Sequence, residues 1–164
     1  MKTTLLILTT AIILTAGCAD NAENTQEQQI TAEVPVMTIP GSLEVPSGEG
    51  LAAFDESLHD AVLLYCWIPM GNYEESLSDL LFLGTVAERG ITAVPVQFDG
   101  EVRNAAQNQL NQLEIPLGVA LGNDSLREYL GVELLPSAVL VLNTGEEFRA
   151  SGFGAAERAV RSGN

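Results

Sequence analysis

The sequence predicts one α/β domain, a three-layer sandwich in which helices flank a central mixed sheet. The continuous apolar run at 61–68, bounded by Asp60 and Pro69, is typical of a strand buried on both faces of a sheet. Strand-like and helix-like segments alternate after this run, which favours a partly parallel sheet. An apolar strand at 137–142 and an alternating strand at 147–153 flank a glycine-containing turn at 143–145, which predicts a closing hairpin. A chain of 164 residues is long enough to bury one sizeable core.

The first seventeen residues have the pattern of a bacterial signal peptide and are excluded from the domain. Lys2 provides a positive charge, and the apolar run at 5–14 is too short for an ordinary membrane span. The run ends in residues 15–18, Thr-Ala-Gly-Cys, which resemble the lipobox of bacterial lipoproteins. This resemblance implies cleavage before Cys18 and lipid attachment to Cys18, and the acyl chains would form a stable anchor. The alternative is an ordinary signal peptide followed by an incidental cysteine.

Residues 18–33 are predicted to form a flexible acidic tether between the anchor and a domain that spans 34–164. They are polar and contain too few large apolar groups to offset the entropy of ordering. We expect the protein to be lipid-anchored in the bacterial cell envelope and to face the periplasm. Ala19, directly after the lipidated cysteine, favours the outer membrane over the inner membrane.

The charge of the chain excludes several classes of partner. The sequence has 22 acidic side chains against seven basic ones, and its net charge is −15. No basic patch is available for phosphates, so we expect no nucleic-acid partner and no contact with anionic lipid beyond the acyl anchor. The acids are scattered and lack the spacing of an EF-hand, so we predict no metal site, and we expect no cofactor.

The other elements of the domain follow from local signals. Three prolines within 34–46 favour edge strands or a wrapped arm, and 47–60 is expected to be loop with a short helical turn. Glu74 and Glu75 complement the dipole of a helix that is predicted to end at Arg89. The later elements are predicted as strand 91–98, helix 101–113, strand 116–121, a brief helix 125–131 capped by Asp124, strand 137–142, strand 147–153 and helix 155–160.

Four blocks of the domain match, in order and separation, the pattern of one known superfamily. In that superfamily a strand ends in a pair of aromatic residues, and Tyr65-Cys66 falls on this pair. The pattern of acids and leucines in the helix that follows is found at 74–80. A segment leading to a proline lies at 129–137, and a hairpin signature lies at 143–146. By these blocks the chain resembles the thioredoxin superfamily, and most closely its TlpA-like, membrane-anchored thiol–disulfide reductases. The resemblance implies a thioredoxin-like fold, a cis peptide bond before Pro136, and a former reactive site between the first two blocks.

The former reactive site lacks its thiols. Met70 and Tyr73 fall on the two cysteines of the family's Cys-x-x-Cys motif, with Gly71 and Asn72 between them. A methionine thioether cannot deprotonate, and a tyrosine phenol, with a pKa of about 10, performs no thiol–disulfide exchange. The remaining cysteine, Cys66, is expected to be a small buried hydrophobe, the alternative being an exposed, reactive free thiol. We therefore expect a degenerate site without catalytic residues.

Other chemistries find less support. A peroxiredoxin alignment would put Tyr73 and Ser76 where that family has its working threonine and cysteine. His59, the only histidine, is predicted to lie in an exposed loop without a nameable catalytic partner. A Cu(I) site of His59, Cys66 and Met70 would have suitable soft ligands but an unfamiliar spacing. No phosphate-binding or dinucleotide-binding glycine pattern is present.

These observations favour an envelope lipoprotein whose redox-inactive, thioredoxin-like domain binds a protein or peptide of the envelope. Two alternatives stay open: a residual thiol–disulfide oxidoreductase that uses Cys66 or a thiol of its partner, and a purely structural lipoprotein. If the protein is an enzyme, we expect it to be a thiol–disulfide oxidoreductase. The predicted binding face consists of Trp67, Met70, Gly71, Asn72, Tyr73, Leu135, Pro136 and Ser137.

Overall fold

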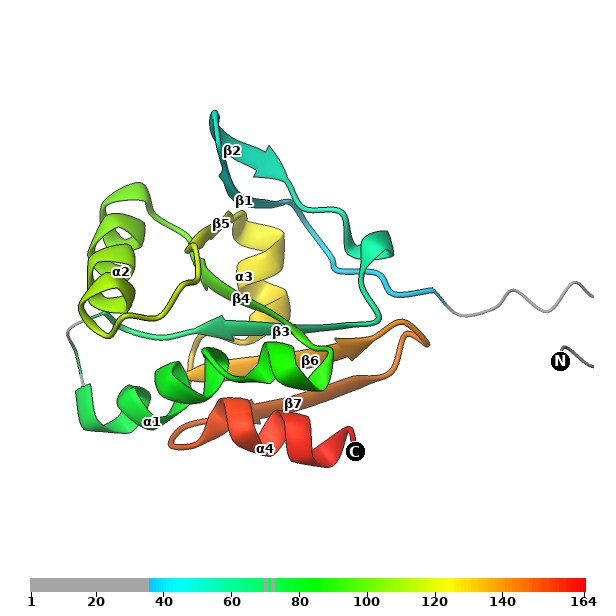
Figure 1. The fold of residues 1–164 in the computed structure, drawn as a ribbon. Coiled ribbons are helices and arrows are strands. Elements are labelled where there is room, and N and C mark those ends of the chain that lie inside the picture. The colour runs from blue at the N-terminus through cyan, green and yellow to red at the C-terminus, as the bar shows by residue number, and fades with distance from the viewer. Residues whose placement is uncertain (1–35, 70, 72) are drawn as a thin grey trace, which may run out of the picture. The chain divides into compact units, whose positions relative to one another are not determined.

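Seven strands form one mixed sheet in the computed structural model, in the order β2-β1-β5-β4-β3-β6-β7 (Figure 1). The structure describes residues 36–69, 71 and 73–164, so the predictions for residues 1–33 lie outside the described residues. β4 pairs in parallel with both β3 and β5, and the other neighbours are antiparallel. The strands are β1 Leu43–Ser47, β2 Gly50–Ala53, β3 Ala61–Cys66, β4 Thr92–Gln97, β5 Ala120–Gly122, β6 Ser137–Leu142 and β7 Glu147–Ser151.

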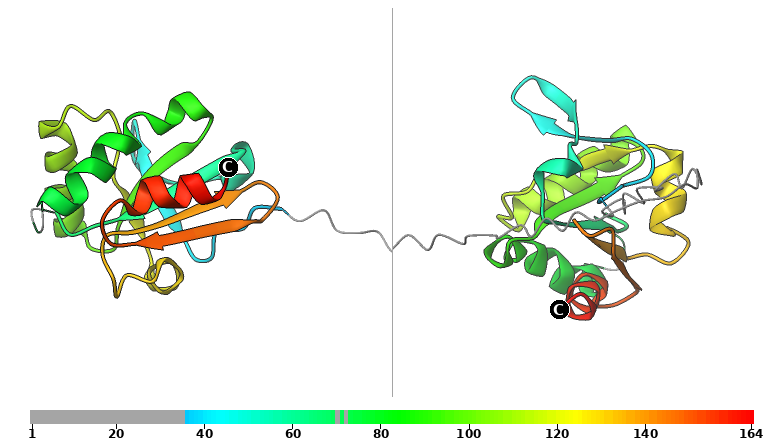
Figure 2. Two further views of the ribbon diagram at one scale, coloured as in Figure 1. Left: turned by 90° about the horizontal axis from the view of Figure 1, so that it is seen from below. Right: turned by 90° about the vertical axis from the view of Figure 1, so that its right-hand side faces the viewer.

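Helices cover both faces of this sheet, which confirms the predicted three-layer α/β architecture. α1, α2 and α4 pack on one face, whereas α3 and an N-terminal arm at 37–43 pack on the other. The left view of Figure 2 shows α1 and α4 on one side of β6 and β7 and α3 on the opposite side. The helices are α1 Tyr73–Leu83, α2 Gly100–Gln112, α3 Asp124–Leu130 and α4 Ala155–Ser162, with 3₁₀ helices η1 Glu56–Leu58 and η2 Val86–Arg89.

β3 lies at the centre of the fold and is buried along its whole length, as the apolar run predicts. Its side chains alternate between the two faces because successive residues of a strand point in opposite directions. Leu63 and Tyr65 join the core under α1 and α4, whereas Val62, Leu64 and Cys66 join the core under α3. The last residue of β3 therefore has its side chain on the α3 side.

The order of the chain explains which helix covers which face. The steps from β3 to β4 and from β4 to β5 run in the same direction across the sheet. Right-handed crossovers then place both connecting helices, α1 and α2, on the same face. The next step returns across the sheet from β5 to β6, and its helix, α3, lies on the other face.

The helix that was predicted to extend to Arg89 is interrupted. α1 ends at Leu83, and a separate 3₁₀ helix, η2, ends at Arg89 and is followed by its C-cap residue Gly90, which has φ of 73°. Gly84 has a low helix propensity, and the Thr85 hydroxyl donates to the Phe82 carbonyl instead of leaving that carbonyl to the helix. The predicted glycine stop is correct, but the segment before it forms two pieces.

The strand predicted at 116–121 is shorter and lies slightly later, as β5. The side chain of Gln107 in α2 accounts for the shift. Its amide nitrogen donates to the Leu117 carbonyl at 3.0 Å, and its carbonyl accepts from the Val119 N–H at 2.8 Å. The backbone before β5 therefore bonds to a helix side chain rather than to the neighbouring strand.

β1 falls mostly in the segment that was predicted to form edge strands or an arm, whereas β2 forms where loop was expected, and the two make a β-hairpin. β1 and β2 pair from Glu44 with Ala53 to Ser47 with Gly50, and β2 is exposed along its length.

The strands and helices described above belong to one unit, Glu33–Asn164, that contains its own core. None of the helices in the described part of the chain has the length and apolar character needed to span a bilayer.

Candidate functional site

Three connections meet at the edge of the sheet where β3 ends, at the left of Figure 1. Cys66, the last residue of β3, pairs with Ser137, the first residue of β6. The Gly152 N–H, just after β7, donates to the Pro136 carbonyl at 2.7 Å. The turn after β3, the loop before β6 and the turn after β7 are therefore neighbours. The Leu135–Pro136 peptide bond is cis, which confirms the prediction made from the family resemblance.

The structure corrects the predicted exposure of Trp67. Its side chain is only 1% exposed, because it continues the inward alternation of Leu63 and Tyr65. The indole N–H donates to Gln109 Oε1 of α2 at 2.8 Å, and Gln97 Nε2 donates to the Trp67 carbonyl at 2.9 Å. Trp67 thus anchors the turn to the core and to α2 and does not belong to a binding surface.

Asp79, a buried residue of α1, forms hydrogen bonds with both β3 and α4 near the same edge of the sheet. Asp79 Oδ2 accepts from the Tyr65 hydroxyl at 3.3 Å, and Oδ1 accepts from the Ala156 N–H at 3.2 Å. Asp79 thereby caps α4, whose N-cap residue Gly154 has no side chain to do so. Burial raises the pKa of Asp79 above its ordinary value, although these hydrogen bonds oppose the shift. Sequence reasoning missed this role; its signal is a carboxylate next to the buried Leu80 on the inner face of α1.

Cys66 is buried, as predicted. Its side chain is 2% exposed and lies among the apolar residues of the α3 side. Burial raises the pKa of the thiol to about 12, and the positive charge of Arg127 only partly offsets that increase. Near neutral pH the group is a thiol rather than a nucleophilic thiolate.

Three large apolar side chains are exposed on the three neighbouring connections. Ile68 follows β3 and is 59% exposed, Leu134 precedes the cis proline and is 69% exposed, and Phe153 follows β7 and is 62% exposed. We call these three residues the apolar face. Leu134 and Phe153 were not predicted, because only the fold brings their loops beside the end of β3.

The other residues of the predicted binding face have mixed positions. Leu135 is half-buried and Gly71 is exposed, whereas Pro136 and Ser137 are buried. The Ser137 hydroxyl donates to the Leu130 carbonyl at 2.5 Å, so this side chain is committed to the fold. Met70 and Asn72 lie outside the described residues. Tyr73 is the first residue of α1.

His59 lies at the opposite end of β3 and takes no part in this site. It is half-buried rather than exposed, because its ring stacks on Phe54 with centroids 4.9 Å apart and its Nδ1 lies 2.9 Å from Thr92 Oγ1. The length of β3 separates it from Cys66, so the structure does not bring the proposed copper ligands together. No group of three or more His, Cys, Asp or Glu side chains among the described residues could hold a metal ion.

Comparison with known proteins places this geometry in a structural class. No family model matches the sequence, and no curated protein sequence matches it significantly. Solved structures do match. A thioredoxin-family thiol:disulfide interchange protein from Chlorobium tepidum aligns with a TM-score of 0.56 at 16% identity, covering 79% of this chain and 94% of that one. The fold is thioredoxin-like.

Two further solved structures of this thioredoxin-like class align over most of the chain. A putative thiol:disulfide interchange protein DsbE from Chlorobium tepidum has a TM-score of 0.52 at 18% identity and covers 79% of this chain and 93% of its own. The exposed lipoprotein thioredoxin Etrx1 of Streptococcus pneumoniae has a TM-score of 0.52 at 17% identity, with coverages of 74% and 96%. At these identities the likeness establishes the fold, and function must be argued from the site.

Proposed function

We propose that this chain is an envelope lipoprotein whose thioredoxin-like domain binds an extended segment of a protein or peptide and performs no thiol–disulfide exchange. One observation carries the proposal. At the end of β3, the apolar face of Ile68, Leu134 and Phe153 is exposed, whereas the thiol of Cys66 is buried. Among the described residues, the edge that a reductase would use for chemistry presents contact surface, and its cysteine is buried.

The state of Cys66 argues against exchange. Thiol–disulfide exchange begins with attack by an accessible thiolate on a disulfide sulfur. With a pKa of about 12, roughly one molecule in 10⁵ would carry the thiolate at pH 7, and the sulfur lies beneath other side chains. A second thiol to resolve a mixed disulfide would have to come from the partner, because Met70 and Tyr73 occupy the family's cysteine positions.

The apolar face argues for binding. Its side chains come from three separate loops that the hydrogen bond between Gly152 and Pro136 and the pairing of Cys66 with Ser137 hold together. Covering large apolar side chains contributes about 25 cal/mol for each Å² removed from water. The net charge of −15 disfavours acidic partners, so we propose an apolar segment that is neutral or basic.

An array of immobilised peptides of varied charge and hydropathy tests this proposal. The protein should bind apolar, neutral or basic peptides, and Leu134→Asp and Phe153→Asp should each reduce binding at least tenfold. Leu58→Asp is the matched control, because Leu58 is 76% exposed and precedes β3 at its opposite end. Binding that all three variants reduce equally would refute the assignment to this face. Absence of binding to any peptide would favour the purely structural lipoprotein.

A residual oxidoreductase is the second candidate, and one observation favours it. Although buried, Cys66 lines a small pocket beside Leu135, next to the cis proline. A partner thiol would complete an exchange there. The test is an insulin-reduction assay alongside labelling of Cys66 with a thiol reagent, folded and in urea. Rapid labelling of the folded protein together with reduction of insulin would establish the enzyme and overturn the first proposal.

The lipid anchor is also a proposal, because Cys18 lies outside the described residues. It is supported by the lipobox-like segment before Cys18 and is tested by radiolabelled palmitate in a bacterial host. The wild-type chain should incorporate the label, and Cys18→Ser should not. Cys66→Ser is the control and should label like the wild type. Separating the membranes of the same cells tests the preference for the outer membrane.

A further inference from the structure

A small pocket of about 210 Å³ lies on the α3 side of the sheet, beside the ends of β3 and β4. Its walls are mainly apolar and come from two stretches of the chain, one contributing Phe98 and Val102 and the other Val132 and Leu135. Arg127 of α3 provides its positive charge. This volume is below the roughly 300–1,000 Å³ of sites for drug-sized ligands, so any occupant is a small group.

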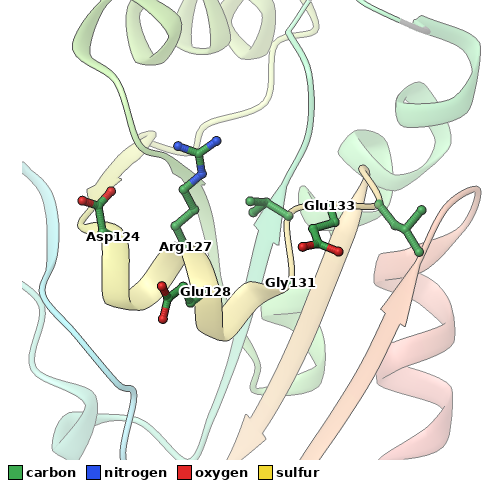
Figure 3. Close-up of a pocket in the computed structure, with 7 residues that line it drawn as sticks. Asp124, Arg127, Glu128, Gly131 and Glu133 are labelled. Carbon is green, nitrogen blue, oxygen red and sulfur yellow. The ribbon is translucent and has the colours of Figure 1, made fainter.

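Arg127 lies between this pocket and a wider hollow of about 840 Å³ around α3 and the loop that follows it. Figure 3 shows the side chains of that hollow, with the Arg127 guanidinium extending from α3 and directed away from the Glu128 and Glu133 carboxylates. The two ion pairs of the described residues are Arg149–Glu147 and Arg161–Glu157. Arg127 belongs to neither of them.

The other arginines of the described chain all have partners. Arg103 donates to the Val119 carbonyl, Arg158 donates to the Phe153 and Ser151 carbonyls, and Arg89 lies over the ring of Phe82. Arg127 is exposed, and it is the one arginine of the described residues for which neither a carboxylate or carbonyl partner nor an aromatic ring is found. Its five donors are available to a ligand.

The pocket's own polar groups do not compete for Arg127. The Asp99 carboxylate caps α2, since its Oδ1 accepts from the Glu101 N–H at 2.8 Å and from the Val102 N–H at 3.0 Å. The Cys66 sulfur is a neutral thiol near pH 7 and carries no charge to pair with the guanidinium. The Gln97 amide donates to the Trp67 carbonyl. The site therefore combines the unpaired Arg127 cation with an apolar recess whose lining also includes the Asp99 side chain.

We infer that this pocket binds a short apolar group that carries one carboxylate. The carboxylate would pair with Arg127, whose planar fork matches two carboxylate oxygens, and the apolar chain would lie against Val102, Val132 and Leu135. A phosphate ligand is disfavoured, because its second charge would add repulsion from the −15 chain and from nearby Asp124 and Glu128. A free branched carboxylic acid or the C-terminal residue of a peptide supplies the same chemistry. The inference does not depend on the proposed function.

Titrations of the ¹⁵N-labelled protein followed by NMR test the inference with four probes. They are 4-methylpentanoate, its uncharged amide, inorganic phosphate and N-acetyl-glycyl-leucine with a free carboxylate. We expect 4-methylpentanoate to shift the amide signals of Phe98, Val102 and Val132 in a saturable manner. The amide and phosphate should bind at least tenfold more weakly. Binding of the acetylated dipeptide would identify a peptide C-terminus as a source, whereas binding of the free acid alone would identify small carboxylic acids.

Two variants and a matched control make the outcome decisive. Arg127→Gln should weaken 4-methylpentanoate binding at least tenfold, and Val132→Phe, which fills the pocket, should do the same. Arg161→Gln makes the same change in net charge at an exposed site on α4 and should leave the affinity unchanged. The inference is overturned if no saturable shifts occur at the pocket, if phosphate binds as well as the carboxylate, or if Arg127→Gln retains full affinity.

Discussion

The two sides of the end of β3 differ in how completely their polar groups are paired. On one side, which we call the Trp67 side, Tyr65, Trp67, Asp79 and Gln109 form buried hydrogen bonds that connect β3 with α1, α2 and α4. On the other side, which we call the Cys66 side, there is a pocket, a buried thiol and the unpaired Arg127. The comparison separates the residues that fix the turn from those that remain available to a ligand.

One polar group on the Trp67 side, the amide nitrogen of Gln109, has no hydrogen-bond partner. Trp67 only donates, so Gln109 must turn its carbonyl oxygen towards the indole, and its buried amide nitrogen is left without a partner. A buried unsatisfied donor costs about 1–3 kcal/mol. Gln109 of α2 therefore bonds to Trp67 at the expense of its own amide nitrogen, which is consistent with an anchoring role for Trp67.

The largest effect that the comparison predicts follows from Trp67→Ala. This change empties a fully buried position and removes the hydrogen bond to Gln109, so the free energy of unfolding should fall by about 3–5 kcal/mol. Trp67→Phe is the control for ring volume and should cost less, about 1–3 kcal/mol, because it removes only the indole donor and much of the packing remains. Urea denaturation followed by circular dichroism measures both. A loss below about 1 kcal/mol for Trp67→Ala would contradict the anchoring role.

Asp79→Asn should change how stability depends on pH. Because the folded protein raises the pKa of Asp79, the native state binds more protons than the unfolded chain between the unfolded pKa, about 3.9, and the higher folded pKa. This group therefore makes the wild type more stable as pH falls through that window and less stable as pH rises through it. Urea denaturation at several pH values should show the wild type gaining stability relative to Asp79→Asn on acidification.

The control for this pH effect is Glu101→Gln, which removes an exposed carboxyl at the start of α2. This variant shows how much of the pH dependence follows from the removal of any one carboxyl group. If the difference between wild type and Asp79→Asn were constant with pH, or if the wild type lost stability relative to this variant on acidification, the raised pKa of Asp79 would be wrong.

On the Cys66 side, the predicted effect is on reactivity. Only the thiolate reacts with iodoacetamide, so for a pKa of about 12 the labelling rate of the folded protein should rise about tenfold for each pH unit from 7 to 10. In urea the rate should be much faster and should level off above pH about 8.5, the ordinary cysteine pKa. Mass spectrometry of the Cys66 peptide measures both profiles. A folded-state rate that levels off below pH 9 would mean that the thiol is activated.

The sequence predicts the two sides unequally, for physical reasons. Local signals were enough for β3 and for the burial of Cys66, because an apolar run can be recognised along the chain. The cis bond before Pro136 was predicted from the resemblance to a known family. The prediction that Trp67 is exposed was wrong. Side chains of a strand point to alternate faces, and because Cys66 points to the α3 side, Trp67 points into the opposite core.

Long-range contacts account for what the sequence does not reveal about the candidate site. Arg127 and Cys66 line the same pocket only because α3 packs on the sheet, and Gly152, next to Phe153, bonds to Pro136 only because β7 returns along β6. Asp79 could have been noticed as an acid beside buried leucines, but its partner, the start of α4, lies 77 residues later in the chain. Spacing along the sequence cannot reveal such partners.

The smallest predicted effect is the stability change caused by Arg127→Gln, and it is the most discriminating. An exposed arginine without a partner contributes little to stability, at most a few tenths of a kcal/mol from its position in the last turn of α3. Urea denaturation should therefore place Arg127→Gln within about 0.5 kcal/mol of the wild type, whereas Arg103→Gln, which removes a half-buried hydrogen bond to Val119, should cost about 1 kcal/mol. If Arg127 belongs to a ligand site, its removal should weaken binding and leave the stability of the fold almost unchanged. A loss above about 1 kcal/mol for Arg127→Gln would instead make Arg127 part of the framework, and the contrast between the two sides of β3 would disappear.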